Sequence, residues 1–474
     1  MENISKETKA GLDAAEENRK AVKGKEILVV GMGRSGVASA RTLHELGAKV
    51  TCQDSKTRDK IDPKLVTWLE KENIPYIFGA SPDNVGQYDT IVLSPGVASD
   101  LEFLCTARDM GVEVIGELEM AYRLSKGTYV GITGTNGKTT TTTLVGNIFR
   151  NADRNTAVVG NIGVAVMSRA LESTDDEWMI AEVSSFQLET TETFRPHISA
   201  VLNLTPDHLN RHKTMERYGE AKAAVFKNQT EDDFLVINCD SREAMELPEK
   251  YGCRAKIVPF SRKKELEYGA CLYNDRLVFR DSNGKIRDFC GKDELKIIGD
   301  HNIENALAAA AIGFCAGISP EIIGETIKAF PGVEHRIEYC GNVDGVKFYN
   351  DSKGTNTDAA IIAINAIREN IILIAGGDGK AQDFTEFAKR LNGPVKHLIL
   401  LGRDGKIIGD AAEKAGFTSI FYEKDMNCCV RKAVELAEAG DNVLLSPACA
   451  SWDMYDNYEQ RGDHFKDCVN QLLK

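Results

Sequence analysis

Residues 131–143 constrain the fold most strongly, because they place a glycine-rich turn between a short apolar run and a threonine-rich segment. The turn reads Gly-Thr-Asn-Gly-Lys-Thr over residues 134–139. Glycines let backbone amides surround a phosphate, the lysine adds a positive charge, and a threonine hydroxyl can bind Mg²⁺. The pattern predicts a strand, a phosphate-binding turn and a helix, in a chain that uses ATP or a similar triphosphate.

The match to the general P-loop pattern is incomplete. Ile132 stands where the first glycine is expected, and the nearest glycine is Gly131. The alternative is a glycine turn that merely precedes a threonine-rich helix. A Gly-Lys-Thr sequence where a strand turns into a helix favours phosphate binding. The candidate ATP-binding residues in this segment are Gly134, Thr135, Asn136, Gly137, Lys138, Thr139 and Thr140.

Length and charge narrow the class of protein. The 474 residues suffice for three domains of roughly 150 residues each. A net charge of −13 argues against a nucleic-acid partner, which would need a basic face. The amino terminus lacks the apolar core of a signal peptide, and no apolar stretch is long enough to insert into a membrane.

The cysteines indicate the redox compartment. The chain has 12 cysteines but no Cys-x-x-Cys spacing, so neither a disulfide framework nor a zinc site is predicted. Buried, reduced thiols in the cytoplasm are the expected state. We expect a monomer that acts on small molecules.

The first domain is expected over residues 1–116, with a polar extension over 1–22. A buried-type strand at 26–30 runs into Gly-Met-Gly-Arg-Ser-Gly at 31–36, and a second strand ends at Asp54. This is the dinucleotide-binding fingerprint and by itself suggests NAD. A lone fingerprint is weak, because any phosphate or close strand–helix packing can use it, so an NAD-dependent oxidoreductase is one open alternative.

The remaining chain predicts two further α/β domains, at 117–332 and 333–474. Both alternate strands with helices, as parallel sheets require, and residues 232–298 are rich in strand-forming residues. The expected architecture is a Rossmann-like amino-terminal domain, a central P-loop domain with a parallel sheet plus a small β-sheet, and a Rossmann-like carboxyl-terminal domain.

Several side chains at strand ends and on helices are candidates for ligand binding. Glu182 ends a predicted strand and is the best Mg²⁺ candidate besides the turn, although a surface carboxylate is the alternative. A lone His208 is more often structural. On pattern alone Lys222 is an exposed lysine of an amphipathic helix. Asn302 and Asn305 share a helix face, so they either meet one ligand or serve as a cap and a surface residue.

Polar and cationic residues also gather at predicted strand ends of the third domain. Each alone is more often a solvated group, but their clustering suits a carboxylate or phosphate ligand. These residues are His335, Arg336, the segment 351–357 and Lys380.

Five motifs in order along the chain resemble the Mur ligases of peptidoglycan synthesis. The resemblance covers residues 24–474, and the tail at 445–463 is similar to the carboxyl-terminal signature of the members that add D-glutamate. The motifs are residues 134–139, 182–189, Asp207-His208, His301-Asn302-x-x-Asn305-Ala306 and Asn350-Asp351-Ser352-Lys353.

The resemblance implies an ATP-dependent ligase that adds D-glutamate to UDP-N-acetylmuramoyl-L-alanine through an acyl phosphate and a tetrahedral intermediate. It implies that Lys138, Lys222 and His208 are catalytic, with Lys222 carbamylated. Two Mg²⁺ ions are implied, with metal ligands drawn from Thr139, Glu182, His208 and Lys222.

The resemblance also implies three sets of binding residues. The implied ATP contacts outside the glycine turn are Asn302, Asn305, Arg336 and Asp351. The implied UDP-substrate contacts are Arg34, Ser35, Asp54, Ser55, Gly96, Asn161 and Ser184. The implied D-glutamate contacts are Lys353, Thr355, Lys380, Ser451 and Tyr458, the last standing where the best-known relatives have phenylalanine. A Mur ligase that adds a different amino acid is the alternative within the family.

Overall fold

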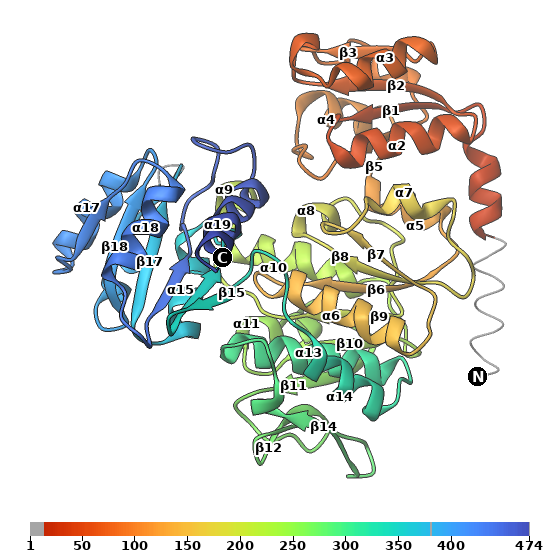
Figure 1. The fold of residues 1–474 in the computed structure, drawn as a ribbon. Coiled ribbons are helices and arrows are strands. Elements are labelled where there is room, and N and C mark those ends of the chain that lie inside the picture. The colour runs from red at the N-terminus through yellow and green to blue at the C-terminus, as the bar shows by residue number, and fades with distance from the viewer. Residues whose placement is uncertain (1–13, 380–381, 474) are drawn as a thin grey trace. The chain divides into compact units, whose positions relative to one another are not determined.

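The computed structural model describes residues 14–379 and 382–473 of the chain. Within these residues the chain forms three sheets of five, nine and six strands (Figure 1). The five- and nine-stranded sheets lie in one compact unit, and the six-stranded sheet lies in a second. This confirms the predicted α/β class. No helix in the described part of the chain is both long enough and apolar enough to cross a membrane.

The five-stranded sheet follows the glycine-rich fingerprint. All of its strands are parallel, in the order β3-β2-β1-β4-β5. Successive residues of β1 pack on opposite faces, Val29 with one hydrophobic cluster and Leu28 with another, so the strand is apolar throughout. The elements are β1 (Glu26–Val30), α2 (Arg34–Glu45), β2 (Lys49–Asp54), α3 (Pro63–Lys71), β3 (Tyr76–Phe78), β4 (Thr90–Leu93), α4 (Glu102–Asp109) and β5 (Glu113–Gly116).

The nine-stranded sheet has the order β14-β13-β12-β11-β10-β9-β6-β8-β7. Its strands are β6 (Thr128–Thr133), β7 (Thr156–Gly160), β8 (Trp178–Glu182), β9 (Ile198–Val201), β10 (Phe234–Asn238), β11 (Lys256–Ser261), β12 (Gly269–Tyr273), β13 (Arg276–Arg280) and β14 (Ile286–Gly291). Its helices are α5 (Glu117–Leu124), α6 (Lys138–Asn151), α7 (Val166–Ala170), α8 (Ser185–Leu188), α9 (Leu209–His212), α10 (Met215–Ala223), α11 (Arg242–Met245), α12 (Leu247–Lys250), α13 (Asp300–Cys315) and α14 (Pro320–Ala329).

The strand-rich segment expected to form a small sheet of its own instead continues the large one. β12 pairs in parallel with β11, where Phe260 lies opposite Ala270, and β13 and β14 then add antiparallel. Both unpaired edges of a separate small sheet would need cover, whereas growth from β11 removes one of them.

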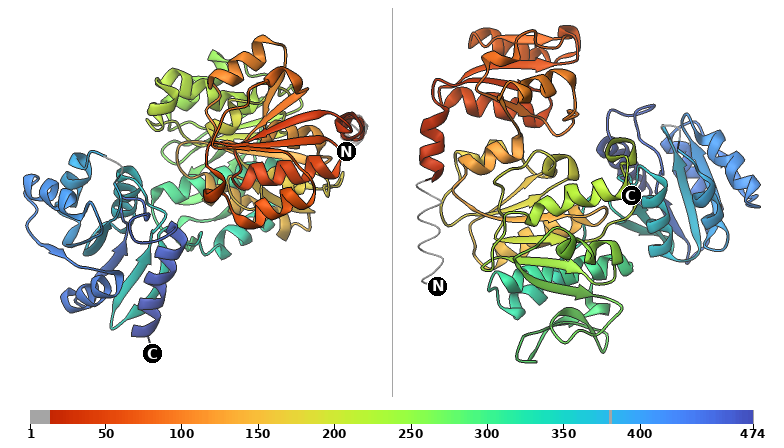
Figure 2. Two further views of the ribbon diagram at one scale, coloured as in Figure 1. Left: turned by 90° about the horizontal axis from the view of Figure 1, so that it is seen from above. Right: turned by 180° about the vertical axis from the view of Figure 1, so that it is seen from behind.

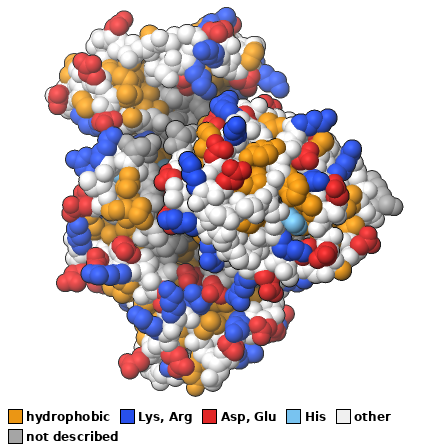
Figure 3. All heavy atoms as spheres, turned by 90° about the vertical axis from the view of Figure 1, so that its left-hand side faces the viewer, with side chains coloured by type: hydrophobic (Ala, Val, Ile, Leu, Met, Phe, Trp, Pro, Cys, Tyr) orange, Lys and Arg blue, Asp and Glu red, His pale blue; other side chains and the backbone are white. Residues whose placement is uncertain are grey.

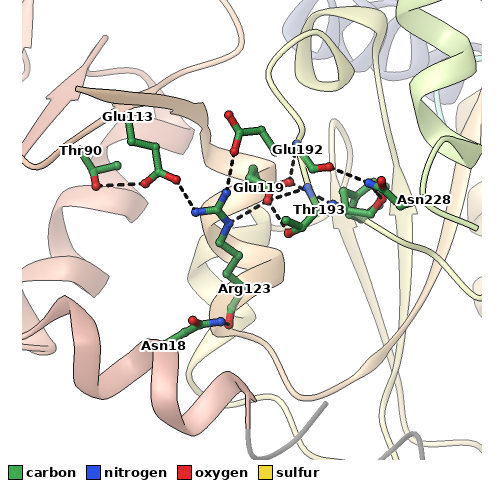
Figure 4. Close-up of polar contacts among 9 residues, drawn as sticks. Asn18, Thr90, Glu113, Glu119, Arg123, Glu192, Thr193 and Asn228 are labelled. Carbon is green, nitrogen blue, oxygen red and sulfur yellow. Dashed lines mark hydrogen bonds and ion pairs between the residues drawn. The ribbon is translucent and has the colours of Figure 1, made fainter. Parts of the chain in front are cut away.

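The two sheets of the first unit are joined without a linker, because β5 ends at Gly116 and α5 begins at Glu117. The Gly116 amide donates to the carbonyl oxygen of Thr190 over 3.1 Å. Near the end of α5, the Arg123 guanidinium bonds to three carboxylates (Figure 4). They belong to Glu113 of β5, to the fully buried Glu119 side chain, and to Glu192.

A helix over residues 14–22 lies against this junction. The side chain of Asn18 donates to the Arg123 carbonyl over 2.9 Å (Figure 4). Arg19 donates to the carbonyls of Leu124 and Ala170, each over 2.8 Å. Those residues end α5 and α7, so the guanidinium meets two negative helix termini. The sequence predicts a polar extension over residues 1–22, and the described part of it, residues 14–22, is a helix attached to the domain.

The six-stranded sheet of the second unit has the order β15-β16-β20-β17-β18-β19, parallel except for β15. Its helices cover both faces, α15 to α17 on one and α18 and α19 on the other (Figure 2). The elements are β15 (Glu338–Val343), β16 (Val346–Asn350), α15 (Thr357–Ile367), β17 (Ile371–Gly376), α16 (Thr385–Leu391), β18 (Val395–Leu401), α17 (Gly405–Lys414), β19 (Ile420–Tyr422), α18 (Met426–Leu436), β20 (Asn442–Leu445) and α19 (Tyr458–Leu472).

The surface carries charged side chains of both signs, and the cysteines are unpaired. On the face drawn in Figure 3, Lys and Arg side chains are interspersed with Asp and Glu side chains. All 12 cysteines are free, and Cys105 is the one that is exposed rather than buried or half-buried.

Candidate functional site

The glycine turn connects β6 to α6 in the predicted way. Gly134 and Gly137 have φ angles of +154° and +83°, which side-chain-bearing residues rarely adopt. A Cβ atom on Gly137 would lie 2.2 Å from the Asn305 side-chain oxygen, so the turn and α13 are in close contact. The turn ends at Lys138, the first residue of α6, and the positive end of that helix therefore faces the turn.

The two lysines of the candidate site meet at this turn. Lys138 Nζ donates to the carbonyls of Gly134 and Thr135, each over 2.8 Å. Lys222 Nζ, from α10, donates to the same Gly134 carbonyl over 2.8 Å and lies over the Tyr218 ring. Lys222 is only 1% exposed, so the pattern-based interpretation as an exposed lysine was wrong. The cause is tertiary packing, which the helix periodicity does not reveal.

Burial changes the protonation of Lys222. Its pKa is lowered well below the ordinary value, because the ammonium loses its water and because the positive charge of Lys138 is near. Asp207 opposes the shift without reversing it. A larger share of the Lys222 amine is therefore neutral, and so nucleophilic, than of a surface lysine.

Glu182 ends β8 beside the turn and is 1% exposed, so the alternative of a surface carboxylate is wrong. Its Oε1 atom accepts a hydrogen bond of 2.8 Å from the Asn161 amide. Its Oε2 atom and the hydroxyl oxygen of neighbouring Thr133 are buried and have no hydrogen-bond partner among the described residues. A buried, unpartnered carboxylate oxygen is costly unless a cation or donor meets it. Together with Thr139, which is 4% exposed, this donor set fits Mg²⁺.

His208 lies close enough to Lys138 and Lys222 for their charges to act on it. It adopts a left-handed backbone angle of φ +53°, and its side chain is 49% exposed. Desolvation is the largest effect and lowers the pKa of His208. The positive charges of Lys138 and Lys222 lower it further, while the negative charge of Asp207 opposes them. The imidazole is therefore neutral near pH 7 and can offer a ring nitrogen to a metal.

A cavity of about 1210 Å³ opens beside the first glycine loop. Asp54 holds that loop, because its carboxylate oxygens accept from the Met32 amide at 2.6 Å and from the Lys56 amide at 2.8 Å. Five of the residues implied to bind the UDP substrate line the cavity: Arg34, Ser35, Asp54, Ser55 and Gly96.

The other two residues of that set do not line this cavity. Asn161 bonds to Glu182, as described above. Ser184 is the N-cap of α8, where it accepts from the Gln187 amide over 3.3 Å. Asn161 and Ser184 thus lie beside the carboxyl-terminal end of β8 rather than in the cavity.

The two asparagines of α13 have different partners. Asn305 accepts from the Thr141 hydroxyl over 3.3 Å and contacts the glycine turn. Asn302 donates to the Ile298 carbonyl over 2.7 Å and groups with the second unit. Asn305 is therefore the one that the structure brings to the phosphate turn.

In the second unit, Asp351 is 4% exposed and accepts a hydrogen bond of 2.7 Å from Ser446. Burial raises its pKa to about 7, against the opposing effect of Ser446 and the positive charges of Arg336 and Arg461. Arg336 keeps a buried Nε without a hydrogen-bond partner in the described part of the chain, as expected of a group that meets a ligand.

The candidate amino-acid contacts also fall within the second unit. Lys353 Nζ lies 5.3 Å from the centre of the Tyr458 ring, and the Thr355 amide donates to the Lys353 carbonyl. Ser451 is 2% exposed and follows β20. Lys380 lies outside the described residues.

Three known domains match the chain in order. Residues 25–116 match the Mur ligase MurD-like N-terminal domain. Residues 132–313 match the Mur ligase middle domain, and residues 335–449 match the Mur ligase glutamate ligase domain.

Curated relatives are similar along almost the whole chain. The UDP-N-acetylmuramoylalanine–D-glutamate ligase of Thermoanaerobacter sp. is 46% identical over 96% of this chain and 100% of the relative. The enzyme of the same name from Alkaliphilus oremlandii is 47% identical over the same shares of both chains. The chain belongs to the Mur ligase family.

Solved Mur ligases share the fold. The UDP-N-acetylmuramate–alanine ligase of Thermotoga maritima covers 95% of this chain and all of its own, with a TM-score of 0.58 at 21% identity. A pseudomurein peptide ligase from Methanothermus fervidus reaches a TM-score of 0.57 at 18% identity, with 95% and 100% covered.

Sequence reasoning missed one residue that shapes the phosphate turn of this Mur ligase. The Asn203 side chain accepts from the Asn136 amide over 2.8 Å and donates to the Asn136 carbonyl over 3.1 Å. Its position just beyond β9, at the ligand-binding edge of a parallel sheet, was the available signal.

His212 is a second residue that was missed. It is 4% exposed and shares a 2.9 Å hydrogen bond with the Ser185 hydroxyl, while its other ring nitrogen lies 3.1 Å from Glu189. It thereby anchors α9, which follows His208, to α8. The sequence offers no signal for this pairing beyond the histidine itself.

Proposed function

We propose that this Mur ligase joins D-glutamate to UDP-N-acetylmuramoyl-L-alanine and converts ATP to ADP and phosphate. The observation that carries the proposal is the Gly137-Lys138 turn together with the buried Glu182 carboxylate, whose Oε2 atom has no hydrogen-bond partner among the described residues. It supports phosphoryl transfer, and the name of the relatives that are 46–47% identical supports the choice of substrates.

The UDP group is assigned to the first-domain cavity, lined by Arg34, Ser35, Asp54, Ser55 and Gly96. NAD is the competing occupant because of the fingerprint. The neighbouring phosphate turn favours the ligase, since an NAD-dependent oxidoreductase leaves that second phosphate site without a purpose. Asn161 and Ser184 are assigned to the part of the substrate nearest Glu182.

The chemistry follows from the charges near the turn. The alanine carboxylate of the substrate attacks the γ-phosphorus of ATP, and the β–γ bridging bond breaks to give an acyl phosphate and ADP. Lys138 neutralises charge on the transferred group, which is the main task of a protein in phosphoryl transfer. The D-glutamate amine then attacks the acyl carbon, and the tetrahedral intermediate loses phosphate to form the amide.

Two Mg²⁺ ions are proposed to accompany ATP. Their role would be to offset the negative charge of the phosphate groups. Thr139 and Glu182 would hold one ion, and His208 together with a carbamylated Lys222 would hold the other. Thr139, Glu182 and the carbamylated Lys222 would each offer a hard oxygen, and His208 would offer a neutral ring nitrogen.

Carbamylation of Lys222 is supported by its burial and lowered pKa. The neutral amine adds to the carbon of CO₂, forms an N–C bond and releases one proton, which gives an anionic oxygen ligand. In Lys222→Ala, activity should be very low and should rise with added formate or acetate. ¹³CO₂ NMR of the wild-type protein should show the carbamate, and full activity of Lys222→Ala without additive would contradict the proposal.

The amino acid is assigned to the second unit. Lys353, Thr355, Lys380, Ser451 and Tyr458 are the proposed contacts, and Asn302, Asn305, Arg336 and Asp351 are the proposed nucleotide contacts outside the turn. We further propose a cytoplasmic monomer, because free thiols and ATP consumption suit that compartment. Light scattering of the purified protein tests the monomer.

The deciding experiment measures phosphate release from ATP with UDP-N-acetylmuramoyl-L-alanine and a panel of amino acids. D-glutamate should be preferred over L-glutamate, L-alanine and diaminopimelate. Preference for another amino acid would identify a different Mur ligase. NADH binding by calorimetry, without any response to the UDP substrate, would favour the oxidoreductase.

A further inference from the structure

Arg34 belongs to the first glycine loop and lines the cavity there, yet its guanidinium bonds to the loop after β7. Its Nη2 atom donates to the carbonyls of Gly160 and Asn161 over 2.9 and 3.3 Å. Its Nη1 atom donates to the Gly163 carbonyl over 3.0 Å. One side chain therefore gathers three carbonyl oxygens of a loop that belongs to the nine-stranded sheet.

That loop is attached to the candidate metal site at its other side. The Asn161 side chain donates to Glu182 Oε1 over 2.8 Å, and its backbone amide donates to the Glu182 carbonyl over 2.9 Å. A single residue thus separates the Arg34 guanidinium from the buried carboxylate.

The loop has little room to adjust. Gly160 and Gly163 have φ angles of +99° and +67°. A Cβ on Gly160 would lie 2.4 Å from the Glu182 carbonyl oxygen, and one on Gly163 would lie 2.3 Å from the Val158 carbonyl oxygen. The backbone on either side of Asn161 is thus packed closely against β7 and β8, and we expect a displacement at the Arg34 end to be passed on to Asn161.

Arg211 makes the converse contact. It stands three residues after His208, on α9, and its guanidinium donates to the carbonyls of Pro95 and Val97 over 3.3 and 3.1 Å. Pro95 and Val97 line the first-domain cavity. An ion pair of 2.8 Å with Glu189 and a contact with the Phe186 ring fix the arginine.

We propose that Arg34 and Arg211 are reciprocal positioning residues, which couple the UDP cavity to the metal-binding side chains. Arg34 acts on Glu182 through Asn161, and Arg211 ties the segment that follows His208 to the cavity wall. The proposal rests on the proposed function, because it takes Glu182 and His208 as metal ligands. It assigns Arg34 a role other than direct contact with the nucleotide.

The first test measures amide hydrogen exchange over residues 158–164 in the full chain without substrate. Loss of three hydrogen bonds in Arg34→Ala should speed exchange at Gly160 and Asn161 by about tenfold or more. Arg41→Ala is the matched control, since Arg41 lies on the same helix but stacks on Trp68. Equal exchange in the two variants would overturn the proposal.

The second test separates positioning from direct binding by kinetics. In Arg34→Ala the Mg²⁺ concentration for half-maximal activity should rise by about five- to tenfold, while KM for the UDP substrate changes by less than about threefold. Arg34→Lys should recover part of the Mg²⁺ affinity. A large rise in substrate KM with unchanged Mg²⁺ dependence would make Arg34 a plain substrate contact and would overturn the proposal.

Arg211→Ala tests the converse contact. Exchange at Val97, whose amide donates to the Ser94 carbonyl, should rise while exchange at Asn161 stays as in wild type. No change at Val97 would remove Arg211 from the pair. Exchange is read without turnover, so a failure of the proposed activity, seen as absent phosphate release by the wild type, is distinguishable from a failure of the coupling.

Discussion

Lys138 and Lys222 donate to one oxygen, because the Gly134 carbonyl lies 2.8 Å from the Nζ atom of each. Two ammonium groups that share an acceptor repel each other, and the more deeply buried one loses its proton more readily. The direction of the Lys222 pKa shift agrees with this. Lys222 is thus the nucleophilic amine of the site.

Lys138 leads to the first prediction. Lys138→Ala should lower kcat at saturating ATP by about 10² or more, because a charge-assisted contact to the transferred phosphoryl group is lost. The melting temperature should stay close to that of wild type. Lys60→Ala, on a short surface turn of the first domain, is the control and should keep full activity. Turnover of Lys138→Ala within a few-fold of wild type would remove the lysine from the transition state.

Glu182 yields a second prediction. Glu182→Gln keeps an oxygen that can accept from Asn161 but loses the charge and the anionic oxygen. The Mg²⁺ requirement should rise by about tenfold or more, while the protein stays as stable or becomes slightly more stable, since a buried carboxylate is costly to keep charged. Calorimetric titration with Mg²⁺ and a nucleotide checks the affinity. An unchanged Mg²⁺ response would exclude Glu182 as a ligand.

Glu117 gives a pH prediction. It is 1% exposed, and burial raises its pKa to about 7 despite a hydrogen bond from the Met167 amide and the charge of Arg34. The folded state therefore binds the proton more tightly than the unfolded chain. The resulting stabilisation is complete below the ordinary pKa of 4.5 and is lost as the pH rises towards 7.

Between pH 5.5 and 8 this effect should lower the free energy of unfolding by about 2 kcal/mol in wild type. Glu117→Gln should show a smaller decrease, so it should be the more stable protein at pH 8. Denaturant unfolding at the two pH values measures this. The control is Glu45→Gln, an exposed residue of α2, which should show the same decrease in the free energy of unfolding between the two pH values as wild type. If Glu117→Gln also shows the wild-type decrease, the Glu117 carboxyl group does not titrate in this range.

The amino-terminal helix gives the fourth prediction. Arg19→Ala should lower the melting temperature by about 3 to 6 °C, because two helix-terminal carbonyls lose their donor. Lys20→Ala, one residue further along, is exposed and should leave the melting temperature unchanged. Removal of residues 1–22 should cost more than removal of residues 1–13. Equal melting temperatures for the two truncations would show that the helix contributes no stability.

Local sequence signals predicted the parts of the fold and site that depend on few residues. The phosphate turn followed from the spacing of Gly134, Gly137 and Lys138, since only glycine accepts the required backbone angles. The strand that ends at Glu182 followed from an apolar run that ends in a carboxylate. In a parallel sheet that position is at the ligand-binding edge whatever the rest of the chain does.

The features that failed depend on contacts distant in sequence. The burial of Lys222 requires a carbonyl 88 residues away, and no helix pattern contains that information. The β12–β14 strands joined the large sheet because β11 offered an edge, which is a property of the assembled sheet rather than of the segment. The prediction that Asn302 and Asn305 share a helix face was correct. The two side chains nevertheless form hydrogen bonds with different residues, Asn305 with Thr141 and Asn302 with Ile298.

The joint between Gly116 and Glu117 limits how modules of this family can be exchanged. A Cβ on Gly116 would lie 2.2 Å from the Thr190 hydroxyl, and four donors from residues 192–194 meet the Glu119 carboxylate just beyond the joint. A chimera that imports a foreign first domain by a cut at this point would keep the Glu119 contacts, but it would lose the ion pair between Glu113 and Arg123 and the close fit of Gly116 against Thr190 unless the foreign domain also ends in these residues. A functional graft therefore has to match the last four residues of the imported domain to the surface that receives them.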